Sequence, residues 1–164
     1  MKKFLPLLFA FLLAAVLAPA PNAAAAHDAA QSAGYTGLRF EDLKWQPIVP
    51  ELGKASPLIA IAHVDPKSQA TQLFIRTPMA IHVPAHWHHA NESHTLLRGT
   101  AVFEHDGQYQ RLAANGFNYV PAKMPHQAWL SAGSLTFITV DGAWDVSWVK
   151  GPPTKADVNQ KPPK

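Results

Sequence analysis

The chain has no cysteine among its 164 residues, so it forms no disulfide and carries no lipid-modified cysteine. An excess of basic charge is also missing. Once residues 1–26 are set aside, 12 Lys and Arg stand against 11 Asp and Glu. Residues 27–149 alone hold eight basic and ten acidic side chains. This balance excludes the basic face or stripe on which nucleic-acid binding depends.

A hydrophobic run long enough for a comfortable transmembrane helix is lacking as well. Residues 4–18 are apolar, follow two lysines and precede a stretch of small residues. That order is typical of a secretory signal peptide spanning residues 1–26, with cleavage near Ala26. An uncleaved membrane anchor is the alternative, which the short run disfavours. The absence of a twin arginine predicts export as an unfolded chain, which makes the mature protein periplasmic or secreted, with no stable membrane anchor.

After residue 26, helical periodicity is weak and short β-type runs alternate with turn residues. Asp106-Gly107 separates two such runs, which is a strong hairpin signal. Many short strands between turns predict an all-β sandwich or barrel. We expect a flexible segment at 27–36, one domain at 37–149 that opens with a short helix or turn, and a disordered Pro/Lys tail at 150–164. The expected strands cover residues 56–64, 71–83, 93–105, 108–113, 116–122, 126–132, 135–142 and 143–149.

Residues 82–94 contain five of the nine histidines of the chain. In a strand, the spacing of His86 and His88 places both side chains on one face. Glu92 follows after what looks like a short turn, and His126 comes from a separate segment. Three imidazoles and one carboxylate suit a first-row divalent metal ion. Four protein ligands leave two open positions on an octahedral ion, and catalysis needs such a position.

The segment HWHHANESHTLLRG (86–99) resembles the first motif of the cupin superfamily, which reads His-x-His, three residues, Glu, six residues, Gly. The segment GFNYVPAKMPH (116–126) resembles the second motif through Gly116, Pro121 and His126. Its Gly-to-Pro spacing is one residue short, and Lys123 stands where the family usually has glycine. The usual Asn after the histidine is replaced by Leu130.

The flanks WQPIVPELG (45–53) and VDGAWDVSWV (140–149) look like those of single-domain ChrR-like cupins, and the similarity extends over residues 43–149. The resemblance implies a double-stranded β-helix, or jelly-roll, barrel with the metal inside. It also implies that the metal ligands are His86, His88, Glu92 and His126. This family is named for the zinc-binding cupin-like half of an anti-sigma factor, but the export signal and the absence of a helical anti-sigma region oppose a transcriptional role.

The remaining histidines have other expected places. Strand parity points His94 inward beside Glu92. Three roles are open to it there: it lines the pocket, it donates a hydrogen bond to a metal ligand, or it shuttles a proton. The alternative is a core histidine bonded to a backbone carbonyl. His82 is expected at the rim, since Pro84 interrupts its strand, and His89 at the surface.

The tryptophans and Lys123 are candidates for substrate contacts. Trp87 lies between two expected ligands and Trp129 lies three residues after a third, so strand alternation should turn both outward, to pack on the barrel or at a dimer interface. Lys123 can bind an anionic substrate at the barrel mouth, or it is simply a solvated lysine.

The sequence leaves two classes of function open. One is a small metalloenzyme for a small oxygen-rich or aromatic molecule, with dioxygenase chemistry if the metal is redox-active and Lewis-acid chemistry if it is zinc. The other is a non-catalytic metal or small-ligand binding protein or sensor.

A protein that takes up metal after export is expected to contain Zn or Cu, since these bind most tightly, with Fe, Mn or Ni as the other candidates. A homodimer is also expected, because cupins are often dimers.

Overall fold

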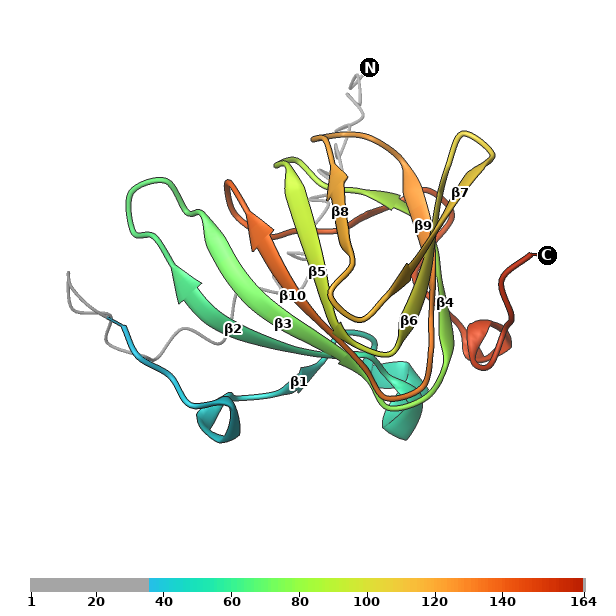
Figure 1. The fold of residues 1–164 in the computed structure, drawn as a ribbon, viewed down its shortest axis with the longest axis horizontal. Helices are drawn as coiled ribbons and strands as arrows, with labels where there is room; N and C mark the ends of the chain where they lie inside the picture. Colours follow the sequence, from blue (N-terminus) through green and yellow to red (C-terminus); the bar gives the residue numbers. More distant parts are fainter. Residues whose placement is uncertain (1–35, 164) are drawn as a thin grey trace, which may run out of the picture. The chain divides into compact units, whose positions relative to one another are not determined.

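The computed structural model describes residues 36–163, whose strands form two antiparallel β-sheets (Figure 1). The first sheet has the order β1 (Gln46–Pro47), β2 (Leu58–Val64), β3 (Thr71–Thr77), β10 (Ser134–Val140), β5 (Glu92–Arg98) and β8 (Phe117–Val120). The second has the order β11 (Ser147–Trp148), β4 (Ile81–Trp87), β9 (His126–Leu130), β6 (Thr100–His105) and β7 (Gln108–Ala113). Three short 3-10 helices are η1 (Phe40–Asp42), η2 (Pro50–Ala55) and η3 (Lys155–Asp157).

This architecture confirms the expected all-β jelly-roll barrel. The strand β10 lies between β3 and β5 in the first sheet, and β9 lies between β4 and β6 in the second. Such neighbours are distant in sequence because the chain passes repeatedly from one sheet to the other. The expected signal peptide and residues 27–35 lie outside the described residues. Within residues 36–163, no helix has both the length and the hydrophobicity required to cross a bilayer.

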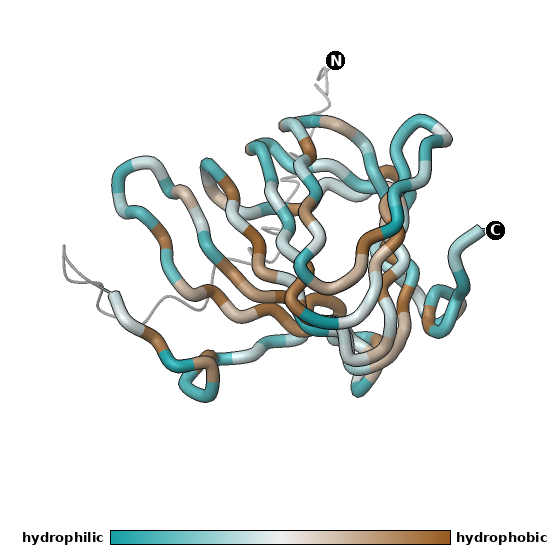
Figure 2. Tube along the Cα trace, viewed as in Figure 1, coloured by the Kyte–Doolittle hydropathy of each residue, from teal (hydrophilic) through white to brown (hydrophobic). Residues whose placement is uncertain are grey.

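Hydrophobic residues recur along the strands of both sheets (Figure 2), and some of them form two buried clusters. One buried cluster joins β5, β6 and β9 through Leu96, Phe103 and Ala128. A second joins β3 and β10 through Leu73 and Ile138. Alternation along each strand places these residues on the inner faces, while hydrophilic residues occupy the connecting loops.

The expected hairpin is confirmed at Asp106 and Gly107, which join β6 to β7. Their φ angles are 49° and 75°, the left-handed pair that a type I′ turn requires. The single strand expected at 71–83 is two strands in the structure, because β3 ends at Thr77, before Pro78, and β4 begins at Ile81 in the other sheet.

A break in the register of β4 decides which of its histidines enter the barrel. The pairing with β9 shifts between Val83 and His86, where Pro84 cannot donate a ladder hydrogen bond. Val83 lines the interior before the shift, and His86 lines it after the shift. His82 has the same sequence parity as His86, yet its ring stacks on Trp129, with 4.6 Å between the ring centroids.

The expectation of a disordered tail at 150–164 is wrong for residues 150–163. Val158 forms a β-bridge with Ile81, and Thr154 caps η3 in a capping box with Asp157. Asp157 also accepts a hydrogen bond from Nδ1 of His82 at 2.9 Å. Pro153 is buried and lines the cavity described below. A segment too polar to fold alone is ordered here because the barrel supplies both an apolar surface and polar partners.

Candidate metal centre

Three buried histidines converge inside the barrel. His86 and His126 are directly opposite each other on the paired strands β4 and β9, and His88 follows β4. One ring nitrogen from each of the three lies within 4.8 Å of the others. The register of two neighbouring strands therefore brings together histidines 38 and 40 positions apart in the sequence.

Each of these imidazoles is oriented by a backbone carbonyl. Nδ1 of His86 donates to the carbonyl of Pro84 at 2.8 Å, and Nδ1 of His126 donates to that of Met124 at 3.1 Å. Nδ1 of His88 donates to the carbonyl of Asp145. Because each Nδ1 donates to a carbonyl, the neutral form of each ring presents the lone pair of Nε2, which is the tautomer required of a metal ligand.

Glu92 adds a carboxylate at the edge of this group. Its Oε2 lies 3.1 Å from Nε2 of His88 and 3.2 Å from Nε2 of His94. Neither Oε2 of Glu92 nor Nε2 of His88 has a partner with hydrogen-bonding geometry, although both atoms are buried. His94 therefore faces the pocket, as strand parity predicted. The assignment of Glu92 as a fourth ligand remains a prediction. Among the described residues, the group whose ligand atoms all lie within 4.8 Å of one another consists of the three histidines.

Burial and mutual repulsion keep two of the histidines neutral. Burial, with the neighbouring histidines, lowers the pKa of His86 to about 3, and burial lowers the pKa of His126 to about 4. Burial alone would lower the pKa of His88, but the Glu92 carboxylate outweighs it, and the net shift is upward. Burial alone would raise the pKa of Glu92, but His94 and His88 hold it well below its usual range. A divalent cation bound at Nε2 of His88 would take the place of the proton that the Glu92 carboxylate favours there.

This donor set fits a divalent metal ion. Buried nitrogen and oxygen atoms without hydrogen-bonding partners are costly in a folded protein, and a bound cation removes that cost. His86, His88 and His126 would hold the ion, with Glu92 beside them. Three imidazoles leave positions on the metal for water or a substrate, as catalytic zinc sites do.

The histidine group lies in a cavity of about 80 Å³. Residues of both sheets line this cavity. Val49, which precedes η2, also lines it, and the segment after β10 contributes Trp144, Val146 and Trp148. Of the two tryptophans expected to face outward, Trp129 packs against His82 and Trp87 against His89, and neither lines this cavity.

No family model matches the chain, and no curated protein matches it. Solved structures do. KdgF from Halomonas sp. is 14% identical over 66% of this chain and 94% of its own, with a TM-score of 0.54. A proposed acetylacetone dioxygenase from Methylibium petroleiphilum is 16% identical over 78% and 90%, with a TM-score of 0.56. An RmlC-like cupin from Shewanella frigidimarina is 15% identical over 66% and 92%, with a TM-score of 0.55. The chain has the cupin fold.

At one departure from the second motif, the backbone keeps a conformation that is typical of glycine. Lys123, where the resemblance leads us to expect glycine, has a φ of 63°, a left-handed conformation that glycine adopts most readily. Its backbone N–H donates to the carbonyl of His88 at 2.8 Å, which ties the second-motif loop to the first motif. Its side chain is exposed and does not line the cavity, so the structure gives it no substrate contact.

Sequence reasoning missed Asp145. Its carbonyl orients His88, and its carboxylate accepts hydrogen bonds from the backbone N–H of His89 at 3.0 Å and from Nδ1 of His89 at 2.5 Å. His89 is exposed, as predicted. No motif could have identified Asp145, because the group that acts on the ligand is a backbone carbonyl 57 residues away.

Proposed function

We propose that this protein is an exported metal-binding cupin and a small metalloenzyme. One observation carries the proposal: ring nitrogens of three buried imidazoles lie within 4.8 Å of one another in a cavity inside the barrel. A bound divalent ion would supply Lewis-acid chemistry, or dioxygen chemistry if it is redox-active. The chain itself orients the three ligands through backbone carbonyls, excludes water with apolar walls and places His94 beside Glu92 to hold or move a proton.

The similar structures support an enzymatic role only in general terms. One is the proposed acetylacetone dioxygenase, one is described as a DMSP lyase and one as a polyketide cyclase. These names share a small organic substrate and differ in reaction, as expected of a fold that hosts many chemistries. Zn or Cu is the proposed resident metal, because export denies the chain the cytosolic control that favours weaker-binding ions.

Export rests on the sequence of residues 1–26. The test is to express the full chain with its own leader, fractionate the cells and determine the N-terminus of the mature protein. We expect the protein in the periplasm or medium, beginning near His27. A mature chain that still begins at residue 1 and remains in the cytoplasm would contradict this part of the proposal. Light scattering tests the proposed homodimer.

A second candidate is a non-catalytic metal or small-ligand binding protein of the ChrR-like type. The same cavity and histidines support it, so metal binding alone does not separate the two. Purified protein should therefore be analysed for metal, reconstituted with Zn, Cu, Fe, Mn and Ni in turn, and screened for turnover with oxygen consumption as one readout. Turnover that disappears on chelation supports the enzyme. Ligands that raise the melting temperature without turnover with any metal support the binding protein.

A further inference from the structure

The walls of the cavity are apolar apart from the metal-binding end. Beyond the four histidines and Glu92, the lining residues from 36–163 that carry a polar side-chain atom are Thr136, Trp144 and Trp148. The indole N–H of Trp144 is buried without a hydrogen-bond partner, so it can donate to one acceptor of a ligand. The remaining lining is aliphatic or aromatic, and comes from both sheets, from residues 48–57 and from the C-terminal segment. A ligand group that enters beyond the metal therefore exchanges water for hydrocarbon.

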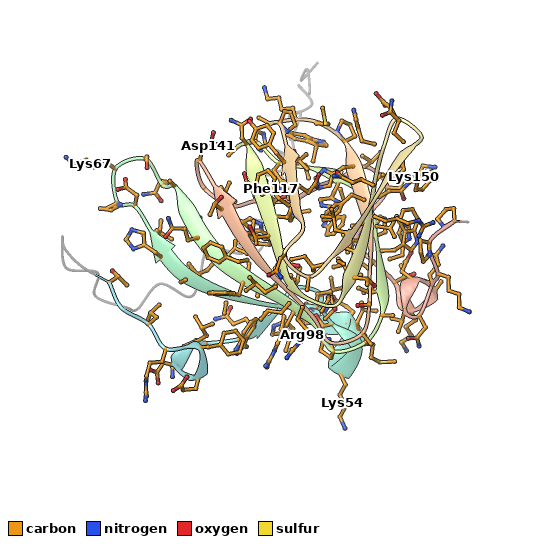
Figure 3. The ribbon with its side chains drawn as sticks, in the orientation of Figure 1. Lys54, Lys67, Arg98, Phe117, Asp141 and Lys150 are labelled. Carbon is orange, nitrogen blue, oxygen red and sulfur yellow. The ribbon has the colours of Figure 1, made fainter. Side chains whose placement is uncertain are left out.

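Cations are absent from the lining as well. No lysine or arginine among residues 36–163 lines the cavity. Lys54, Lys67, Arg98 and Lys150 lie at the periphery of the unit, away from its interior (Figure 3). A carboxylate or phosphate in the cavity would have no counter-ion except the metal, and burying an unpaired charge is very costly. A polyol would likewise lose its hydrogen bonds with water.

We propose that the ligand is a small neutral molecule whose oxygen atoms are confined to the end that meets the metal and whose other end is apolar. This inference rests on the proposed function and narrows it, because it excludes oxygen-rich substrates such as sugars and sugar acids. The cavity has about half the volume of an engineered cavity of roughly 150 Å³ that binds benzene. The buried apolar end is therefore a short alkyl chain or part of one ring.

The test uses hydroxamates that share one metal-binding head and differ in their tails. The cobalt-substituted protein is titrated with acetohydroxamate, butyrohydroxamate, 4-hydroxybutyrohydroxamate and the monohydroxamate of succinic acid, and visible absorption gives each Kd. Two added methylene groups should tighten binding by about tenfold. A terminal carboxylate in place of the methyl group should weaken it by at least about tenfold. Equal or tighter binding of the carboxylate or hydroxyl tail overturns the inference.

A variant and its matched control locate the effect in the cavity. Val146 is half-buried and lines the cavity, whereas Val149 is 54% exposed and does not. Val146→Lys should reduce or reverse the preference for the butyl over the succinyl tail, and Val149→Lys should leave it unchanged. A preference that survives Val146→Lys, with the fold confirmed by circular dichroism, contradicts the proposed location.

Amides that carry the same tails but lack the metal-binding hydroxamate test the apolar cavity independently of the proposed metal centre. Butyramide should raise the melting temperature of the metal-free protein, and succinamate should not. If cobalt fails to bind but this difference appears, the metalloenzyme fails and the apolar cavity stands. If cobalt binds and the tails do not differ, the metal centre stands and the inference fails.

Discussion

Oε2 of Glu92 lies 3.1 Å from Nε2 of His88, and both atoms are buried. The same oxygen lies 3.2 Å from Nε2 of His94. Glu92 and His94 project from one face of β5, while His88 follows β4 in the other sheet. One carboxylate thus links a histidine of the proposed metal centre to a histidine that the motif does not require.

Glu92→Gln should weaken zinc binding by about 10- to 100-fold, because it removes the negative charge beside the three imidazoles while keeping the side-chain shape. The measurement is competition with a chelator of known affinity. Glu51→Gln is the matched control, since Glu51 is exposed and does not line the cavity. Equal affinities of the two variants would show that Glu92 neither binds the metal nor supports a ligand.

His94→Gln should keep one metal ion per chain, since His94 does not belong to the three-histidine group. If His94 moves a proton, the variant should lower kcat by about 100-fold or more and change its pH profile. His126→Gln is the comparison, because it should lose the metal itself. Loss of metal from the His94 variant would instead make His94 a ligand.

Gly99→Ala should destabilise the protein by about 2 kcal/mol or more. Gly99 has a φ of 89°, and a Cβ there would lie 2.7 Å from Oγ of Ser131 and 2.8 Å from Cβ of Ser134. Gly133→Ala separates the steric clash from the backbone strain, since φ is 69° there and a Cβ would meet nothing within 4 Å. Urea unfolding should show a clearly larger loss for the Gly99 variant, and similar losses would refute the clash.

Asp157→Asn should destabilise the C-terminal segment by about 1 kcal/mol at pH 7. Oδ2 of Asp157 accepts hydrogen bonds from the backbone and side chain of Thr154, and Oδ1 accepts one from His82. Burial alone would raise the pKa of Asp157, but these hydrogen bonds lower it below its usual value. Its contribution is therefore present near neutral pH and is lost as the pH falls through the folded-state pKa.

Trypsin cleavage at Lys150 and Lys155 measures this change. Cleavage of the Asp157 variant should be faster than that of the parent chain at pH 7. Asp106→Asn is the control, since the side chain of Asp106 is 84% exposed and lies in a distant turn. An equal rate for all three proteins would mean that Asp157 does not hold the segment in place.

The metal-free protein should lose stability between about pH 6.5 and pH 4. Unfolded histidine has a pKa of about 6.5, whereas burial lowers the pKa of His86 to about 3 and that of His126 to about 4. Over this range the unfolded chain binds more protons, so acidification favours unfolding. The raised pKa of His88 acts in the opposite direction and reduces the effect.

Urea midpoints at pH 7.5, 6 and 5 in the presence of a chelator test this prediction. His126→Gln should show a shallower pH dependence than the parent chain, because one of the buried neutral imidazoles is gone. A parent midpoint that does not change with pH would contradict it. Added zinc should raise the midpoint at pH 7.5 more than at pH 5, because protons compete for the imidazoles.

Local pattern was sufficient for most strands and turns. The Asp106-Gly107 hairpin and the inward direction of His94 follow from turn chemistry and strand parity, which depend on neighbouring residues only. The tail at 150–163 was misjudged for the same reason. The composition of this segment indicates that it cannot fold alone. It does not indicate that the segment packs on β4, where Val158 pairs with Ile81.

The sequence by itself predicted an all-β sandwich or barrel through its short strands and turns, and its resemblance to the cupin motifs implied the jelly roll and the candidate ligands His86, His88, Glu92 and His126. Only the tertiary structure decided the rest. The shift at Pro84 sends His82 outward, and the carbonyl of Asp145 orients His88. Both sheets and the C-terminal segment together give the cavity its apolar walls. These features depend on contacts between segments far apart in the chain, which no local pattern encodes.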